Sequence, residues 1–214
     1  MAPRCAAILS LLFACASAVA AESISMPWYV QAGLAVSHQS GLSGREWVVY
    51  PSAPGGTTLG WEVVAGRHLS RLLSLEVEVS STGIMKATEP SRYGMTFVEE
   101  IRNRVALLDL RLRLRLGSVV TVEPLVGFGV LRQTGWSTTE YDDGSSTDRQ
   151  EQGASTAPCL SGGVDLRIGN ERLAIVPTFR VRKAFHGENF AENYWYSPPS
   201  ETHVAVGLQG RLSF

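Results

Sequence analysis

The sequence contains little cysteine and, beyond its N-terminus, no long hydrophobic run. Three cysteines occur in 214 residues, and two of them, Cys5 and Cys15, lie in the N-terminal segment. The third, Cys159, has no partner for an internal disulfide, and no Cys/His spacing typical of a metal site is present. We therefore expect no disulfide framework, no metal and no cofactor.

Charge of one sign is also lacking. The chain has 19 Lys and Arg residues against 20 Asp and Glu residues, so its formal net charge is −1. Nucleic-acid-binding domains usually have a strong basic excess, and we predict no nucleic-acid partner. After the N-terminus no window approaches the roughly 18 consecutive apolar residues of a transmembrane helix. The sequence thus predicts no helical membrane span.

A secretory signal peptide is predicted at residues 1–20. Arg4 provides a positive start, Ala6–Ala16 is an apolar run, and Ala18–Ala20 offers the small residues that a signal peptidase requires. A helical membrane anchor is disfavoured because the apolar run is too short to cross a bilayer. A lipoprotein signal is a weaker alternative, since Leu12–Cys15 only loosely resembles a lipobox.

What the chain does have is a period of two. Residues 21–214 are predicted to form one domain of segments in which apolar and polar residues alternate, as in a β-strand with unlike faces. In Leu108–Leu116 five leucines alternate with one aspartate and three arginines, which a helix would spread around its circumference. Pro124 predicts a bulge or a weakened pairing. Strands are predicted at 28–37, 59–66, 73–80, 108–116, 120–130, 160–168, 173–182 and 202–214.

The connections between these strands alternate between long and short. The long segments, which are polar and contain many glycines and serines, lie at 38–56, 83–100, 132–154 and 183–201. In an up-and-down barrel this rule places four long loops at one rim, and the short turns with both termini at the other. Strands of about 9 to 11 residues suit a tilted crossing of the hydrocarbon. We predict an all-β protein, an eight-stranded antiparallel up-and-down transmembrane β-barrel.

The interior of such a barrel should be charged. The apolar residues would meet lipid and the polar ones would fill a narrow lumen, where charges must pair because an isolated buried ion is costly. We expect Glu76 and Glu78 to lie beside Arg111 and Arg113. A soluble periplasmic barrel of the lipocalin type, with the polar residues in water, is the alternative. The predicted ion-pair cluster comprises Glu62, Glu76, Glu78, Arg111, Arg113, Glu123, Asp165, Arg180 and Arg182, with Arg115, Arg167 and Arg211 on the same face.

Three segments resemble a known family. They are Glu123–Gly129, Ser161–Asp165 and Val206–Phe214, and through them the chain from Trp28 onward resembles the small eight-stranded outer-membrane β-barrels of Gram-negative bacteria, of the outer-membrane protein A and X type. The resemblance implies a cell outer-membrane location with both termini in the periplasm, and contact with outer-membrane lipid and lipopolysaccharide. It also implies that the outer-membrane assembly machinery reads the last strand, through Val206, Leu208, Leu212 and Phe214.

The leading functional hypothesis is a non-enzymatic outer-membrane protein. In this design the barrel is an anchor, and the long loops bind an extracellular ligand or support envelope integrity. Aromatic residues in these loops could contact a ligand, although anchoring at the membrane interface is an equally good reading. An open pore is disfavoured, because a lumen crowded with charges leaves no channel. The loop aromatics are Trp47, Tyr50, Trp136, Tyr141, Tyr194, Trp195 and Tyr196.

An outer-membrane lipid hydrolase is the alternative function. His38 and Ser40 form a His-x-Ser stretch that is similar to that of outer-membrane phospholipases and lipid A deacylases, in which histidine activates a lipid-facing serine. Both residues continue the lipid-facing parity of the first strand. However, Gly41 stands where those families have an asparagine, and no third member of a catalytic triad is evident.

Overall fold

The computed structural model of this chain is an antiparallel barrel. It describes residues 27–39, 56–90, 95–116, 119–185 and 200–214, so the predicted signal peptide lies outside the described residues. Among the described residues, no helix is long and apolar enough to cross a membrane. The strands are β1 (Trp28–Gln39), β2 (Gly56–His68), β3 (Leu73–Ser81), β4 (Met85–Pro90), β5 (Met95–Leu112), β6 (Leu114–Leu116), β7 (Val120–Tyr141), β8 (Gln150–Gly169), β9 (Leu173–Phe185) and β10 (Ser200–Ser213).

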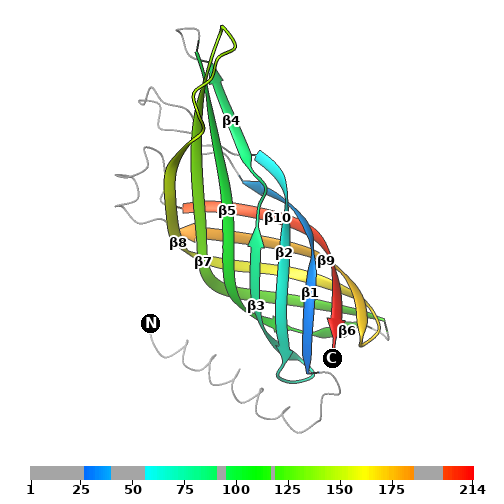
Figure 1. The fold of residues 1–214 in the computed structure, drawn as a ribbon. Coiled ribbons are helices and arrows are strands. Elements are labelled where there is room, and N and C mark those ends of the chain that lie inside the picture. The colour runs from blue at the N-terminus through cyan, green and yellow to red at the C-terminus, as the bar shows by residue number, and fades with distance from the viewer. Residues whose placement is uncertain (1–26, 40–55, 91–94, 117–118, 186–199) are drawn as a thin grey trace, which may run out of the picture.

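These described strands close into a ring of eight (Figure 1). Each pairs antiparallel with its neighbour in the sequence, and β10 returns to pair with β1. β3 and β4 pair with the same edge of β5, and β5 and β6 pair with the same edge of β7, so each of these pairs is one interrupted barrel strand. The predicted eight-stranded up-and-down topology is thereby confirmed.

The interruption between β5 and β6 lies opposite Pro124. Arg111 pairs with Leu125, and Leu114 pairs with Val122 in the same register, but the positions between them are unpaired. Proline lacks the amide hydrogen that the ladder needs at this point. On its other side β7 remains paired with β8 through Pro124. The weakened pairing predicted here is therefore confirmed, whereas the register shift in the β7–β8 pair occurs elsewhere, between Gly135 and Trp136.

The strands are strongly staggered around the ring. A ladder that starts at Tyr29 of β1 crosses every strand and returns to β1 at Gln39, ten residues further along. Such a stagger requires tilted strands. Because every residue in one ladder points to the same side, this circuit decides which distant residues share the interior. Its members are Tyr29, Gly66, Glu76, Asp109, Gly127, Ser161, Arg182, His203 and Gln39.

Most large apolar side chains point outward from the ring, and most of the charged ones point inward. Phe128 of β7 is 62% exposed, while the inward carboxylate Glu123 of the same strand is fully buried. The leucines of Leu108–Leu112 also lie on the outer surface. In a soluble lipocalin-like barrel the same leucines would form the core. The structure contradicts that alternative, because the apolar face would be left in water.

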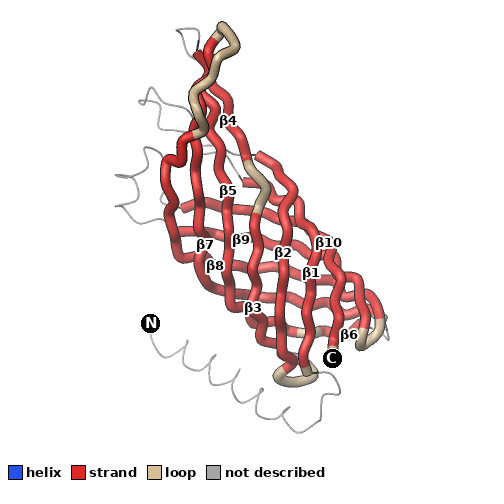
Figure 2. Tube along the Cα trace, viewed as in Figure 1, coloured by secondary structure: helices blue, strands red, loops and turns tan. Residues whose placement is uncertain are grey.

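The prediction of long loops is wrong for two of the four segments. Residues 83–100 and 132–154 are largely strand: Met85 of β4 pairs with Ile101 of β5, and Met95 of β5 pairs with Tyr141 of β7. β4, β5, β7 and β8 thus continue past the ring as a projecting sheet (Figures 1 and 2). Beyond the lipid a strand needs no apolar face, so these segments lack the alternation that reveals the others. The other two predicted loops fall mainly on residues 40–55 and 186–199, outside the described residues.

The barrel therefore has two distinct ends. At one end the backbone of Trp28 exchanges hydrogen bonds with that of Phe214, at 3.1 and 2.9 Å, and we call this the terminal end. The other end carries the β4–β5 and β7–β8 hairpins, and we call it the hairpin end (Figure 1).

Candidate functional site

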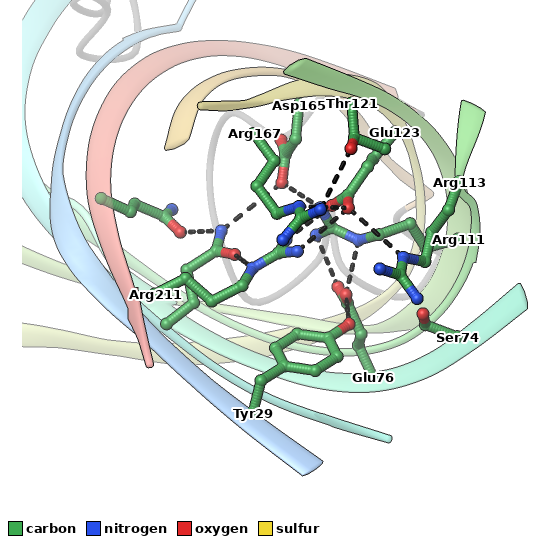
Figure 3. Close-up of polar contacts among 12 residues, drawn as sticks. Tyr29, Ser74, Glu76, Arg111, Arg113, Thr121, Glu123, Asp165, Arg167 and Arg211 are labelled. Carbon is green, nitrogen blue, oxygen red and sulfur yellow. Dashed lines mark hydrogen bonds and ion pairs between the residues drawn. The ribbon is translucent and has the colours of Figure 1, made fainter. Parts of the chain in front are cut away.

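The charged lumen is the most highly organised polar region among the described residues. Inward-facing positions of β2, β3, β5, β7, β8, β9 and β10 contribute to it, because each of these strands places alternate side chains inside the ring. Figure 3 shows part of this network enclosed by the barrel wall. It contains six carboxyl groups, on Glu62, Glu76, Glu78, Asp109, Glu123 and Asp165, and six guanidinium groups, on Arg111, Arg113, Arg167, Arg180, Arg182 and Arg211.

Arg111 is the centre of this network. Its side chain is fully buried, and its guanidinium group contacts carboxylates from three other strands. Nη2 donates to Glu76 Oε2 at 2.6 Å, and Nη1 donates to Glu123 Oε2 at 2.9 Å and also to Asp165. A guanidinium group suits this position because its five donors can serve several carboxylates at once.

Arg211 ties the closing strand to this centre. It holds Glu123 with two parallel hydrogen bonds, from Nη1 to Oε1 at 3.1 Å and from Nη2 to Oε2 at 2.6 Å. Its Nε donates to Gln31 Oε1 at 2.9 Å, and its guanidinium carbon lies 4.6 Å from the ring centroid of Tyr29. The Tyr29 hydroxyl donates to Glu76. β1 and β10, which are the first and last strands, are thus joined through side chains as well as through their backbones (Figure 3).

A second node lies around Arg180 and Arg182 of β9. Arg182 Nη2 is 3.0 Å from Glu62 Oε2 and 2.5 Å from Glu78 Oε1. Arg180 donates twice to Asp165, which also accepts from Arg111. Asp165 therefore connects the two nodes. We expect substitution of Arg111 to weaken the contacts of Arg180, and substitution of Arg180 to weaken those of Arg111.

Asp109 differs from the other lumen acids. It is buried, yet neither of its carboxylate oxygens accepts a hydrogen bond from a described residue. It lies between Glu76 and Gly127 in the cross-strand ladder. A side chain at Gly127 would collide with the Asp109 carboxylate, so the glycine provides the space for this acid.

Towards the hairpin end the lumen contains no arginine–carboxylate cluster among the described residues, and amide side chains take its place. Asn103 Nδ2 donates to Gln39 Oε1 at 2.7 Å, and Gln133 Nε2 donates to Asn103 Oδ1 at 3.1 Å. His203 Nε2 lies 3.2 Å from Glu201 Oε2 in the same group. Beside these residues the interior is apolar, in a cluster formed by Val105, Leu107, Leu131, Ala157, Cys159 and Ala184.

The structure places the predicted cluster residues inside the barrel but pairs some of them differently. Glu76 contacts Arg111 as expected from neighbouring strands, whereas Glu78 contacts Arg182, 104 residues away in the sequence. Arg113 is at the edge of the network, with Nε 3.7 Å from Glu123 and a side chain that is 17% exposed. Arg115, on the same predicted face, is exposed.

Sequence reasoning left several polar partners out of the network. They are Tyr29, Gln31 and Gln209, which share the inward parity of their strands with the arginines and glutamates, as does the acid Asp109. That parity was the available signal. Gln209 Nε2, for example, donates to Glu62 Oε1 at 2.7 Å. Uncharged residues draw less attention in a sequence, although a buried carboxylate needs such donors as much as it needs a cation.

The remaining predicted site residues lie outside the lumen. His38 is on the outward face, with Nδ1 3.0 Å from Thr57 Oγ1, while Ser40 lies outside the described residues, so the hydrolase hypothesis stays a prediction. Among the described residues no group of three or more His, Cys, Asp and Glu side chains has metal-binding geometry. The residues of the predicted assembly signal, Val206, Leu208, Leu212 and Phe214, are exposed on the outer face of the last strand.

The barrel is similar to solved structures of outer-membrane proteins. A major outer membrane protein from Thermus thermophilus aligns with 86% of this chain and 99% of its own, at 15% identity and a TM-score of 0.50. Neisserial surface protein A aligns with 87% of this chain and 97% of its own, at 12% identity and a TM-score of 0.49. Ail of Yersinia pestis aligns with 89% and 100%, at 9% identity and a TM-score of 0.46. The first of these establishes the shared fold.

No family model matches the chain, and no curated protein is significantly similar to it in sequence.

Proposed function

We propose that this chain, whose fold is that of the small eight-stranded outer-membrane β-barrels, is a non-enzymatic integral outer-membrane protein with a closed interior. The observation that supports this most directly is the inversion of its faces. Apolar side chains cover the outside of the ring, while fully buried charges such as Arg111 and Glu123 fill the inside. Such a surface needs lipid around it, because a contiguous apolar belt of this size in water would drive aggregation.

The ion pairs of the lumen support a closed interior. A cavity of about 10 Å³ lies inside the lumen beside Glu62, Arg182 and His203, which is room for about one water molecule. Solute diffusion would require the two nodes around Arg111 and Arg182 to separate. In planar bilayers we expect no stable open conductance from the purified protein, and a large, long-lived conductance would contradict this part of the proposal.

The hairpin end is proposed to face the cell exterior, with both termini in the periplasm. The projecting sheet of β4, β5, β7 and β8 would then be the surface that meets an extracellular ligand or neighbouring envelope components. It presents Trp136 between two arginines, with the guanidinium carbons of Arg102 and Arg149 at 5.9 and 4.3 Å from the ring centroid. Rigid aromatic and arginine side chains of this kind are enriched at binding surfaces.

Cysteine labelling on intact cells tests location and orientation together. In a Cys159→Ala background, Ser145→Cys places a thiol in the exposed β7–β8 turn and Glu171→Cys places one in the exposed turn at the terminal end. We expect a membrane-impermeant maleimide to label the first variant on intact cells, and the second only after the outer membrane is permeabilised. Recovery of the protein in the soluble periplasmic fraction, or the reverse labelling pattern, would contradict the proposal.

Folding into a closed barrel gives an independent check. Such barrels resist detergent until heated, so the unheated protein should migrate faster in detergent gels than the boiled protein, and it should fractionate with the outer membrane. The matched controls are the same two cysteine variants, because each substitutes an exposed turn residue and should leave this behaviour unchanged.

A further inference from the structure

Two arginines face each other on the outer surface of the barrel without a balancing acid. Arg104 of β5 is directly opposite Arg132 of β7, and both side chains are exposed. Neither forms an ion pair or hydrogen bond with a described residue. Like charges directly opposite each other destabilise a sheet. The repulsion between these two guanidinium groups is not offset by any described acid.

The pair sits where the apolar surface ends. The next outward-facing cross-strand pairs towards the terminal end are Ala106 with Val130 and then Leu108 with Phe128. In the opposite direction the outward face carries Arg102 and Trp136, with the guanidinium carbon 5.9 Å from the ring centroid. Tryptophan is typical of the membrane–water interface. Along β5 and β7 the surface therefore passes from lipid-facing residues, through the two arginines, to an interfacial aromatic.

Glu100, an acid on the same face of β5 as Arg104, already has cationic partners. The carboxylate of Glu100 is 2.6 Å from Lys86 Nζ through Oε1, and Oε2 also pairs with Arg149. The neighbours of the arginine pair on the adjoining strands are Ser81 beside Arg104 and Thr156 beside Arg132, which are neutral. The patch formed by Arg102, Arg104 and Arg132 is thus cationic.

We infer that Arg104 and Arg132 form a clamp for a phosphate group of a lipid headgroup in the leaflet at the hairpin end. Guanidinium groups bind phosphate with paired, charge-assisted hydrogen bonds, and a phosphate between the two would remove their mutual repulsion. The apolar residues below would meet the acyl chains of the same lipid. This inference rests on the proposed function for its orientation, under which the lipid is a phosphorylated glycolipid of the outer leaflet.

The test measures lipid binding in vesicles. Wild-type protein is folded into phosphatidylcholine vesicles that contain increasing fractions of diphosphorylated lipid A, and the temperature at which the heat-modifiable folded band is lost is recorded. We expect this temperature to rise with the glycolipid fraction. In the Arg104→Gln/Arg132→Gln variant the same rise should require roughly tenfold more glycolipid, as for the loss of charge-assisted hydrogen bonds.

The matched control is Arg67→Gln/Arg172→Gln. It removes the same charge from the terminal end, where Arg67 lies on the outer surface over Trp28 and Arg172 lies in an exposed turn. It should keep the wild-type dependence on glycolipid. An equal loss in the control, an unchanged dependence in the Arg104→Gln/Arg132→Gln variant, or an equal response of the wild type to dephosphorylated lipid A would each overturn the inference.

Two further arms separate the sources of failure. Inorganic phosphate added to pure phosphatidylcholine vesicles should not reproduce the shift, and a shift as large as that with the glycolipid would overturn the assignment to a lipid. The Arg104→Gln/Arg132→Gln variant should still fractionate with the outer membrane and remain heat-modifiable. Failure of the wild type in that fractionation would instead contradict the proposed function, because the vesicle assay does not depend on cellular location.

Discussion

The barrel interior is filled in two ways, and the change occurs along a single strand. From the hairpin end, the inward-facing residues of β5 are Asn103, Val105, Leu107, Asp109 and Arg111. Around Leu107 the interior is packed with apolar side chains, while two positions further on it is packed with ion pairs. Both sectors are buried to a similar degree, so the difference lies in how they are held together and not in how well they exclude water.

Substitutions in the two sectors should destabilise the barrel in different ways. An apolar side chain that is shortened loses its own contacts and leaves a cavity, and the loss is graded. A buried cation that is removed takes one partner from every carboxylate it contacts, and the loss of stability is large. The charged sector also needs room for its long side chains, which Gly127 provides beside Asp109. Substitutions in the two sectors should therefore lower the free energy of unfolding by different amounts.

The largest effect is expected for Arg111→Met. Methionine is similar in length and apolar, but Glu76, Glu123 and Asp165 would all lose a buried partner. Removing one partner of a buried ion pair costs about 3 to 5 kcal/mol. Urea unfolding of the folded protein in lipid vesicles, followed by tryptophan fluorescence, should show this loss.

Arg172→Met is the control for that substitution. Arg172 lies in an exposed turn, and surface changes of this kind usually alter the free energy of unfolding by less than about 0.5 kcal/mol. If Arg111→Met were as mild as Arg172→Met, the ion pairs would not determine the stability of this sector.

In the apolar sector, Leu131→Ala should destabilise by about 2 to 4 kcal/mol. Leu131 is fully buried, and its truncation leaves a cavity between β7 and its neighbours. Leu160→Ala removes the same atoms from an outward position that is 54% exposed in the isolated chain, where lipid can fill the space. The same unfolding measurement should give a clearly smaller loss for Leu160→Ala. Equal losses would mean that the apolar cluster is no better packed than the outer surface.

The space beside Asp109 is tested by Gly127→Ala. The added methyl group would overlap the Asp109 carboxylate, and overpacking of this kind costs about 1 to 3 kcal/mol. Gly162→Ala is the matched control, since no atom lies within 4 Å of the added methyl group. The double variant Gly127→Ala/Asp109→Ala should recover part of the loss, because the colliding carboxylate is gone. Without that recovery, the clash would have to be with the backbone of β5.

The sequence predicts the ring well because lipid imposes a pattern on it. Each strand that faces hydrocarbon must carry apolar residues at every second position, as in Leu108–Leu112. This alternation can be recognised in a single strand, without knowing which strands pair with it. The strands of the projecting sheet obey no such rule. In β4 and the first part of β5, Lys86, Thr88, Glu99 and Glu100 interrupt any apolar parity, so the sequence predicts a loop there.

Which lumen residues form ion pairs with one another is harder to predict than which residues lie in the lumen. Parity places Glu78 and Arg182 inside, but only the stagger of the strands brings residues 104 positions apart into contact. The stagger depends on the register of all eight strands together, and a one-residue slip in any of them would change it. Pairing of neighbouring strands alone gives Glu76 with Arg111 and misses Glu78 with Arg182.

The smallest effect is expected outside both sectors, at Glu100 of the projecting sheet. The hydrogen bond from Lys86, together with the charge of Arg149, lowers the pKa of Glu100 below its ordinary value. Because the pKa is lowered, ionised Glu100 stabilises this sheet fully at pH values above the ordinary carboxyl pKa. The stabilisation is lost as the pH falls through the folded-state pKa. Lys86 is 62% exposed, so solvent screening should keep the effect below about 1 kcal/mol.

Hydrogen exchange of the β4–β5 amides, corrected for the intrinsic rate at each pH, measures this local stability. Protection should fall between about pH 6 and about pH 3, and Glu100→Gln should show the lower protection at both values. Glu151→Gln, which removes an exposed acid cross-strand from Trp136, should keep the wild-type dependence. If Glu100→Gln kept it too, the pH dependence would belong to another group. The ion pairs of Glu100 would then contribute little to the stability of the projecting sheet, unlike the ion pairs of the lumen.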